Sequence, residues 1–503
     1  MLTDKRILNA ALEKRLYHLI ISRLDGENIP IPEYQDRIFQ LVRNGISGFI
    51  IFGGKKEEVK HFVKTLQTIS ELPLFIASDI ERGVGQQIQG STLFPCQMAM
   101  AAAIDRSNHY DVGILEEAIQ SVADEAEHVG INMPLIPVLD VNQDPDNPII
   151  CTRAFSDDPE VVTWFGLKYI KILEEAGLVS CAKHFPGHGD TSIDSHVSLP
   201  VINKSSEELI STDIVPFRSA INQGVSSIMV GHLSIPAIDT IPASLSREIH
   251  SMLRSALGFK GLILTDALTM HALNDIPDVA VRCLNAGADI LLHPAEPDEV
   301  VKTLLSAVLS GQLPEHRIDS ALTRIINRKE KLRNTSMQEV DYQAYDRLSS
   351  QITDKSVSLI KGVPGIVPVI NRENIHIFMA GDEEPCLRSP LKDLSANIWM
   401  LHEIGVNLDL HNTIAIVAIF TNVAAWKGSA GISENEKNRI RDLIRGSRKS
   451  IIISFGNPYV LRHFPESDVL VAAYEVTDQA QETVVKWLKG SGGLEGRLPV
   501  RLS

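Results

Sequence analysis

Short apolar runs alternate with longer amphipathic segments from the start of the chain to about residue 335. The apolar runs are rich in Ile, Leu and Val and show no polar alternation, which is typical of parallel strands that are covered on both faces. Eight of these runs are predicted to be strands: His18–Leu24, Gly48–Phe52, Leu74–Ser78, Asn132–Asp140, Val179–His184, Ser227–His232, Leu262–Asp266 and Asp289–His293.

The segments between these strands carry the signals of helices. Between Asp111 and Gly130 the apolar residues recur at spacings of three and four, which places them on one helix face, and Gly130 suits the position after a helix end. The sequence Asp158-Pro-Glu160 is typical of a helix start, and Gly177 of the end of that helix. Eight strands alternating with helices favour an α/β fold, a (β/α)8 TIM-like barrel, over a doubly wound sheet.

A second α/β set follows a polar stretch beyond residue 325. Its five predicted strands are Val357–Ile360, Ile375–Met379, Ile414–Phe420, Ser450–Phe455 and Val469–Tyr474. Its predicted helices include Asn435–Arg445 and Gln479–Leu488. We therefore predict a barrel catalytic domain at 1–335, a linker at 336–350, and a smaller α/β sandwich domain with a parallel sheet at 351–503.

Composition narrows the class of partner. The 503 residues carry a formal net charge of −15, so the chain lacks the basic excess that nucleic acids or anionic membranes attract. Its five cysteines show no metal-ligand spacing and are expected to be buried, reduced thiols. No signal-peptide core and no run of membrane-spanning length is evident, so a cytoplasmic location without a membrane partner is expected.

Titratable residues gather at the predicted strand ends. The eight ends are Asp25, Gly53, Asp79, Asp140, His184, His232, Asp266 and His293, and all of them except Gly53 are Asp or His. Catalytic groups of a barrel lie at the carboxyl ends of its strands. The densest stretch runs from Lys183 to His196, Lys-His-Phe-Pro-Gly-His-Gly-Asp-Thr-Ser-Ile-Asp-Ser-His, on a loop shaped by Gly and Pro. A polar loop with solvated histidines is the alternative interpretation.

Asp266 ends the strongly apolar run Gly261-Leu-Ile-Leu-Thr-Asp266. A carboxylate held rigidly there can attack an electrophilic carbon as a nucleophile or bind a cation. The spacing fits equally well a structural role, in which Asp266 caps the helix that follows. Both interpretations stay open on the residues alone.

Asp194-Ser-His196 is the candidate proton shuttle. In an extended loop, residues two apart project to the same side, and a carboxylate beside an imidazole raises its basicity. The alternative is a surface histidine near a turn aspartate. A metal site at His184, His188 and His196 is disfavoured, because the loop spacing does not place them on one helix face. We therefore expect no metal and no cofactor.

Several motifs in order along the chain resemble glycoside hydrolase family 3, within it the β-N-acetylglucosaminidase branch. They are Ser78-Asp-Ile-Glu81 with Thr92-Leu-Phe-Pro95, Pro137-Val-Leu-Asp140 with Arg153-Ala-Phe-Ser156, Lys183-His-Phe-Pro-Gly-His-Gly-Asp-Thr191 with Asp194-Ser-His196, Gly231-His-Leu-Ser-Ile-Pro236, and Thr265-Asp-Ala-Leu-Thr-Met270. The Lys183–His196 stretch is the most specific element.

The resemblance implies roles for individual residues. Asp266 would be the nucleophile, and His196, oriented by Asp194, the acid/base. The residues implied to bind the sugar hydroxyls are Asp79, Arg153, Lys183 and His184. The family usually has Gln-Glu-Gly-Gly-Arg-Val after the strand-three Asp, whereas this chain has Ile80-Glu-Arg-Gly-Val-Gly85. No arginine contact is assigned there, and Glu81 is expected to hold an Arg or Lys side chain.

The implied function is a retaining β-N-acetylglucosaminidase that releases terminal β-linked N-acetylglucosamine, with cell-wall muropeptide fragments as the leading substrate. Alternatives within the family are a β-glucosidase or β-xylosidase, whose acid is a Glu of the second domain, and an N-acetylglucosaminide phosphorylase. A non-catalytic sugar-binding relative is the alternative from another class, and the presence of both Asp266 and His196 argues against it.

Overall fold

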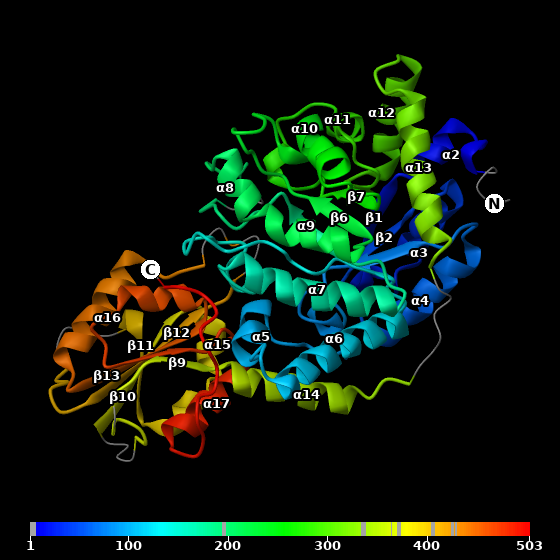
Figure 1. Cartoon of the computed structure of the whole chain (residues 1–503). Helices are drawn as coiled ribbons and strands as arrows, with labels where there is room; N and C mark the ends of the chain where they lie inside the picture. Colours follow the sequence, from blue (N-terminus) through cyan, green and yellow to red (C-terminus); the bar gives the residue numbers. More distant parts are fainter. Residues whose placement is uncertain are drawn as a thin grey trace. The chain divides into compact units, whose positions relative to one another are not determined.

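The structure is a computed structural model that describes residues 7–193, 198–332, 339–363, 365–369, 374–403, 408–423, 427 and 430–502. The chain forms two compact units (Figure 1). Unit 1 comprises Met1–Leu93, Glu116–Val141 and Pro159–Tyr345, and unit 2 comprises Phe94–Leu115, Asn142–Asp158 and Asp346–Ser503. Among the described residues, no helix is both long and apolar enough to cross a membrane.

Unit 1 contains the barrel. Its strands are β1 Ile20–Asp25, β2 Gly48–Phe52, β3 Phe75–Ser78, β4 Met133–Pro134, β5 Cys181–Phe185, β6 Ser227–Val230, β7 Leu262–Thr265 and β8 Leu291–Leu292. They pair in parallel in the orders β4-β3-β2-β1-β8 and β5-β6-β7. Single parallel bridges, Val138 to Lys183 and Leu264 to Ile290, join the two sheets. The predicted TIM-like barrel, with all eight strands, is confirmed.

β4 is much shorter than the predicted 132–140 because prolines interrupt it. Pro134 and Pro137 have no N–H to donate to a neighbouring strand. The backbone nevertheless stays beside β5, since Lys183 N donates to Pro137 O at 3.1 Å and Leu139 N donates to Lys183 O at 2.7 Å. This pairing brings the end of the segment, Asp140, next to the residues that follow Lys183.

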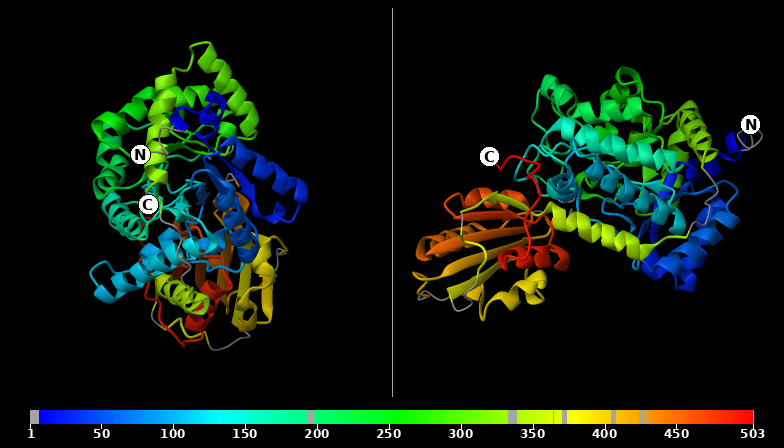
Figure 2. Two further views of the ribbon diagram at one scale, coloured as in Figure 1. Left: turned by 90° about the vertical axis from the view of Figure 1, so that its right-hand side faces the viewer. Right: turned by 60° about the horizontal axis from the view of Figure 1, so that its bottom comes forward.

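The helices between residues 12 and 329 follow the expected alternation with the barrel strands (Figures 1 and 2), although α5 and the start of α6 group with unit 2. They are α2 Leu12–Tyr17, α3 Pro32–Asn44, α4 Lys56–Ile69, α5 Gln97–Ala103, α6 His109–Val129, α7 Pro159–Glu175, α8 Ser206–Ser211, α9 Ile214–Gln223, α10 Arg247–Ser251, α11 Val279–Ala286, α12 Pro297–Leu309 and α13 Glu315–Lys329. The predicted ends are confirmed: Gly130 has φ +89° and Gly177 φ +90°, as glycines after helix ends do.

Unit 2 is built around one six-stranded sheet in the order β11-β10-β12-β13-β14-β9. The strands are β9 Ser358–Lys361, β10 Ile375–Gly381, β11 Asn397–Met400, β12 Ile414–Thr421, β13 Lys449–Gly456 and β14 Val469–Ala472. All five predicted strands are present. The prediction of a parallel sheet is wrong for β9, which pairs antiparallel with β14, and the edge strand β11 was not predicted.

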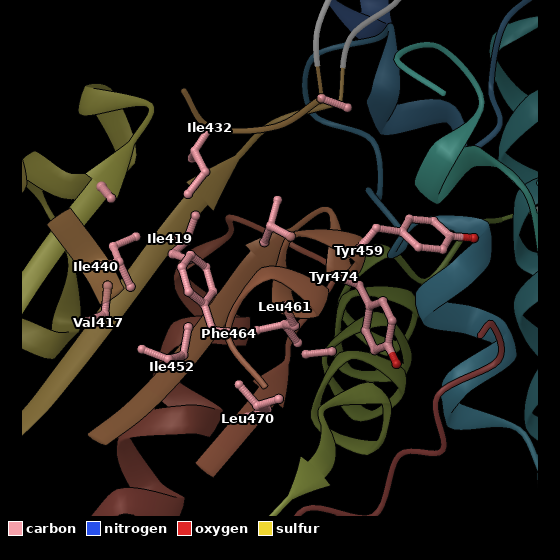
Figure 3. Packing of buried hydrophobic residues seen from close by; sticks show 14 of the residues in the cluster. Val417, Ile419, Ile432, Ile440, Ile452, Tyr459, Leu461, Phe464, Leu470 and Tyr474 are labelled. Carbon is pink, nitrogen blue, oxygen red and sulfur yellow. The ribbon is translucent and has the colours of Figure 1, made fainter. Parts of the chain in front are cut away.

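Helices cover both faces of this sheet. Alternate residues of β12 point to opposite sides, so Val417 and Ile419 share one apolar cluster with Ile440 of α16 (Glu434–Gly446; Figure 3). Ile416 and Ala418 belong to the other cluster, which includes residues of α17 (Asp478–Leu488). The layered α/β sandwich is therefore confirmed.

The compact units are interleaved along the chain. Phe94–Leu115 and Asn142–Asp158, which precede residue 335, group with unit 2. Helix α14 (Tyr342–Ser356) covers part of the stretch predicted to be a linker, and the division between the units falls within it. These two units are defined by their compactness and are discontinuous in sequence, so they do not test the continuous domain bounds 1–335, 336–350 and 351–503, which stay a prediction.

Candidate active site

The carboxyl ends of the barrel strands carry most of the predicted site residues. Asp79 follows β3, Lys183 and His184 lie in β5, and Asp266 follows β7. Asp140 ends the segment after β4. Because the strands are parallel and the sheet closes, these ends lie on one face of the barrel, the face where barrel enzymes hold their catalytic groups.

Lys183 is a deeply buried cation of this face. Its side chain is 1% exposed, and its Nζ lies 2.7 Å from Asp79 Oδ1 and 2.7 Å from Glu81 Oε1. Two carboxylates around one buried ammonium compensate its lost hydration and fix its position. Glu81 is buried while Asp79 is 32% exposed, so Asp79 is the carboxylate that a ligand can reach. The expectation that Glu81 holds a cation is confirmed.

Asp140 anchors the segment around His184. Its carboxylate accepts from His184 Nδ1 at 2.7 Å, from His188 N at 2.7 Å and from His184 N at 3.2 Å. Burial raises the pKa of Asp140, but His184 and His188 outweigh burial and hold the pKa below its ordinary value. The carboxylate can only accept, so the imidazole proton lies on Nδ1 and Nε2 is directed away from this bond.

His188 packs against His184 as a neutral ring. The two ring centroids lie 6.0 Å apart with the planes at 74°, and His188 is buried. Burial lowers the pKa of His188 to about 4, despite the opposing charge of Asp140. In the described part of the chain, no group of three His, Cys, Asp or Glu side chains could hold a metal ion. His196, the third member of the metal alternative, lies outside the described residues.

Asp266 is held by backbone contacts. Its N–H donates to Val230 O at 3.0 Å, in register with β6, and its Oδ1 accepts from Ala267 N at 2.8 Å. The side chain is half-buried. The alternative role as a helix cap is wrong, because the next helical turn, His271–Leu273, is preceded by Met270 as its N-cap residue. Asp266 is thus a rigidly placed carboxylate at the end of β7.

His232 supports the backbone beside Asp266. Its Nε2 donates to Ala267 O at 3.2 Å, since a carbonyl can only accept. Its Nδ1 then accepts from the Ser244 hydroxyl at 2.7 Å. The ring is fully buried. It therefore fixes the turn that carries the carboxylate.

His293 is a further residue of this face that was not assigned a role. It follows β8 with φ +49°, a left-handed conformation that residues with a side chain rarely adopt, and its ring centroid lies 5.5 Å from that of Phe52. Burial lowers its pKa to about 4, the charge of Arg23 lowers it further, and Asp79 opposes them. A neutral imidazole therefore lies within electrostatic reach of Asp79.

The structure brings together only part of the predicted site. Asp79, Lys183, His184 and Asp266 share the barrel face described above. Arg153 belongs to unit 2, where its Nη1 donates to Ile149 O at 3.1 Å, and its predicted contact with the sugar stays a prediction. Asp194 and His196 lie outside the described residues, so the predicted dyad also stays a prediction.

Asp140, His232 and His293 are residues of this face to which the sequence reasoning gave no role, and His188 was considered only as a member of the disfavoured metal site. Asp140, His232 and His293 each stand at a predicted strand end, and that position was the signal in the sequence that could have pointed to them. Their partners could not be found from sequence, because the bonds from Asp140 depend on the backbone path of 184–188.

Comparison with known proteins identifies the class that this barrel and its carboxylates define. The glycosyl hydrolase family 3 N-terminal domain matches residues 14–328, which is more than half of the chain. The chain therefore belongs to glycosyl hydrolase family 3, as its motifs indicated, and it is a glycoside hydrolase.

Three relatives show how far the similarity extends. The chain is 27% identical over 542 residues to β-hexosaminidase A of Pseudoalteromonas piscicida, covering 92% of this chain and 90% of that protein. It is 27% identical over 498 residues to a β-N-acetylglucosaminidase/β-glucosidase of Cellulomonas fimi, covering 87% and 85%. The solved family 3 β-N-acetylglucosaminidase from Paenibacillus sp. str. FPU-7 superposes with a TM-score of 0.81 at 26% identity, covering 98% and 99%.

Proposed function

We propose that the chain is a retaining β-N-acetylglucosaminidase, with Asp266 as nucleophile and His196, oriented by Asp194, as acid/base. The observation that carries this is the rigid carboxylate of Asp266 on the barrel face that also holds Lys183 and Asp79. The names of the relatives from Pseudoalteromonas, Cellulomonas and Paenibacillus support N-acetylglucosamine as the sugar.

The reaction proceeds in two displacements. In the first, an oxygen of Asp266 bonds to the anomeric carbon while the bond from that carbon to the leaving oxygen breaks, and His196 gives its proton to that oxygen. In the second, His196 takes a proton from water, and the water oxygen displaces Asp266 from the anomeric carbon. The sugar keeps its anomeric configuration, and both residues return to their starting states.

Sugar binding is assigned to the residues around the buried cation. Asp79, fixed by Lys183, has oxygen lone pairs for sugar hydroxyls, and His184 can use Nε2 because Asp140 occupies Nδ1. Arg153 is proposed as a further donor to hydroxyl or carbonyl oxygens. Terminal β-linked N-acetylglucosamine of cell-wall muropeptide fragments is the proposed substrate, and the cytoplasm the proposed location.

Leaving-group dependence tests the acid/base assignment. We expect His196→Ala to slow cleavage of a natural disaccharide far more than formation of the glycosyl-enzyme from a dinitrophenyl glycoside, because an acidic phenol needs no proton. Azide should then accelerate turnover of the dinitrophenyl glycoside, since it attacks without a base. His61→Ala, on the exposed surface of α4, is the matched control and should behave like the wild type. An equal slowing of all substrates without azide rescue would contradict the assignment.

Specificity is tested separately. A panel of nitrophenyl β-glycosides of N-acetylglucosamine, glucose and xylose, each with and without inorganic phosphate, should show fastest release from the N-acetylglucosaminide and free sugar as the product. Faster cleavage of the glucoside or xyloside would favour the alternative hydrolases. A sugar 1-phosphate formed in phosphate buffer would favour the phosphorylase.

A further inference from the structure

We propose that unit 2 carries an accessory carbohydrate-binding groove, in which the ring of Tyr110 stacks on a sugar. The ligand is an uncharged oligosaccharide of hexose or N-acetylhexosamine units. The inference goes beyond the proposed function and does not depend on it, because it needs only the class of the chain, a glycoside hydrolase. Nothing in the sequence motifs assigns Tyr110 or its neighbours.

The groove has a volume of about 650 Å³ and is open to solvent. Six of its lining residues lie on α14 at the spacing of one helix face: Asp346, Arg347, Ser350, Gln351, Asp354 and Lys355. Tyr110, in the first turn of α6, and Glu495 complete the lining. All of these residues belong to unit 2, whereas Asp79, Lys183 and Asp266 belong to unit 1.

Tyr110 gives the groove an apolar platform. It is 67% exposed, and no other Phe, Tyr or Trp among the described residues is exposed to that degree. Its hydroxyl accepts a hydrogen bond from Gln351 Nε2 at 3.3 Å, which ties the ring to α14. The ring is thus held at its polar end while most of its surface stays accessible. An aromatic ring with polar groups beside it is the composition of a site that orients a small ligand.

Three charged side chains of the groove are available to a ligand. Asp346, Arg347 and Glu495 make no side-chain hydrogen bond or ion pair with any other residue that the structure describes, although they line one groove with opposite charges. A carboxylate offers two acceptor oxygens and a guanidinium offers a planar fork of donors, so each matches two neighbouring hydroxyls. Hydroxyls on adjacent ring carbons of a sugar present such a pair.

The rest of this helix face is held in place by other helices. Asp354 Oδ1 accepts from Gln479 Nε2 at 2.6 Å and from the Thr483 hydroxyl, both on α17. Lys355 Nζ donates to Asp111 Oδ1 of α6 at 2.5 Å. Because these contacts order the wall of the groove in advance, less conformational entropy is lost when a ligand binds.

The charges favour an uncharged ligand. Three carboxylates and two cations line the groove, and one of the cations, Lys355, is already paired with Asp111. The remaining excess is negative, which repels phosphates and nucleotides. A pyranose ring has an apolar face of C–H groups for Tyr110 and hydroxyls at its rim for Arg347 and Glu495. An oligosaccharide repeats this pattern along the length of a groove.

Isothermal titration calorimetry tests the groove. The probes are sulfur-linked hexamers of β-1,4-N-acetylglucosamine and of β-1,4-glucose, which resist hydrolysis. We expect at least one hexamer to bind the wild type at a site that Tyr110→Ala weakens by roughly tenfold or more. Tyr110→Phe keeps the ring and should bind within about threefold of the wild type. Leu309→Ala, at a residue 78% exposed on α12 of unit 1, is the matched control and should bind as the wild type does.

A second variant tests the polar side of the groove. Arg347→Ala removes an exposed guanidinium that forms no hydrogen bond or ion pair with another described residue, so the fold should be unaffected. Hexamer binding should weaken by roughly fivefold, because a hydrogen-bond donor to the sugar is lost. This variant keeps Tyr110 and therefore tests the groove even if Tyr110→Ala does not fold.

Turnover separates the groove from the barrel site. Tyr110→Ala and Arg347→Ala should cleave the nitrophenyl glycoside that the wild type cleaves fastest at a rate within about twofold of the wild type, since this small substrate needs only the barrel face. A fall of about tenfold or more would assign Tyr110 to the barrel site and overturn the accessory groove. Binding of neither hexamer, or binding that Tyr110→Ala leaves unchanged, would also overturn it.

Failure of the proposed function would be seen elsewhere. It would appear in the His196→Ala and glycoside-panel experiments, neither of which involves Tyr110. The hexamers are not cleaved, so their titrations report on the groove whichever residues perform the reaction.

Discussion

His184 Nδ1 lies 2.7 Å from Asp140 Oδ2, and both side chains are buried at the carboxyl ends of neighbouring barrel segments. The same carboxylate also accepts from two backbone amides of the loop that begins at His184. One residue thus fixes both the ring orientation and the backbone that carries it. A carboxylate that binds one imidazole nitrogen in this way determines which of the two nitrogens is left to face a ligand.

Asp140→Asn should therefore impair both binding and stability. Each carboxylate oxygen faces a donor, so the amide NH2 of Asn would oppose an N–H whichever way it points. We expect kcat/KM to fall by about 10²-fold and the free energy of unfolding to fall by about 2 kcal/mol. Steady-state kinetics and urea unfolding measure the two effects. Asp36→Asn on exposed α3 is the control, and an unchanged kcat/KM would refute the role.

Asp266→Asn and Asp266→Ala should abolish glycosidase turnover while leaving the fold intact. In the proposed mechanism the change removes the oxygen that bonds to the anomeric carbon, so a loss of roughly 10³-fold or more is expected. Circular dichroism and turnover of a nitrophenyl N-acetylglucosaminide are the measurements. Asp275→Asn, exposed on the following loop, is the control. Turnover within about tenfold of the wild type would remove Asp266 from the nucleophile role.

Local patterns were sufficient for the barrel and for most of the sheet in unit 2. Uninterrupted Ile, Leu and Val runs predicted all eight barrel strands, because strands covered on both faces need no polar alternation. For β9 the pattern predicted the strand but not its direction. A strand's direction depends on the path by which the chain returns to the sheet, and β9 returns antiparallel to β14. The edge strand β11 was missed because it is half-buried and has a weak apolar signal.

The site residues also divide into those that the sequence indicates and those that only the structure reveals. Position at a strand end indicated Asp79, His184 and Asp266, because parallel strands in a closed sheet bring these ends together. The bonds made by Asp140 and the contact of Asp213 with Gly187 depend on side-chain packing between segments far apart in sequence. No spacing rule contains that information.

Glu81→Gln should weaken sugar binding more than it slows the chemical step. Lys183 Nζ would lose one of the two carboxylates that lie 2.7 Å from it, and Asp79 would then be drawn toward the ammonium and away from the sugar hydroxyl that it is proposed to bind. We expect KM to rise roughly tenfold with a smaller fall in kcat. The control is Glu58→Gln, which loses an exposed ion pair to Lys55. A KM equal to that of the wild type would show that Glu81 only stabilises the fold.

Glycosidase activity should survive exhaustive dialysis against a chelator and gain nothing from added zinc. Proton transfer by an imidazole–carboxylate pair needs no Lewis acid, and Asp140 already occupies Nδ1 of His184. Activity would be assayed before and after chelation. Loss of activity that one equivalent of a divalent metal restores would support the metal alternative instead.

His18→Leu should make the protein less sensitive to mild acid. His18 is buried at the amino-terminal end of β1, and neither ring nitrogen has a hydrogen-bond partner among the described residues. Burial lowers its pKa from 6.5 to about 3, and the charges of Lys329 and Lys14 add to this. At pH values between these two pKa values, His18 is protonated in the unfolded chain but not in the folded chain. The free energy of unfolding therefore decreases as the pH falls below 6.5.

The size of the effect follows from the pKa difference. At pH 5 the loss due to His18 amounts to about 2 kcal/mol relative to pH 8, because each pH unit below 6.5 costs about 1.4 kcal/mol. Leu carries no proton in either state, so the difference in unfolding free energy between pH 8 and pH 5 should shrink by that amount in urea titrations. His61→Leu, exposed on α4, is the matched control. If the free energy of unfolding falls by the same amount on acidification in His18→Leu and in the wild type, the pKa of His18 in the folded chain is not lowered and the prediction is wrong.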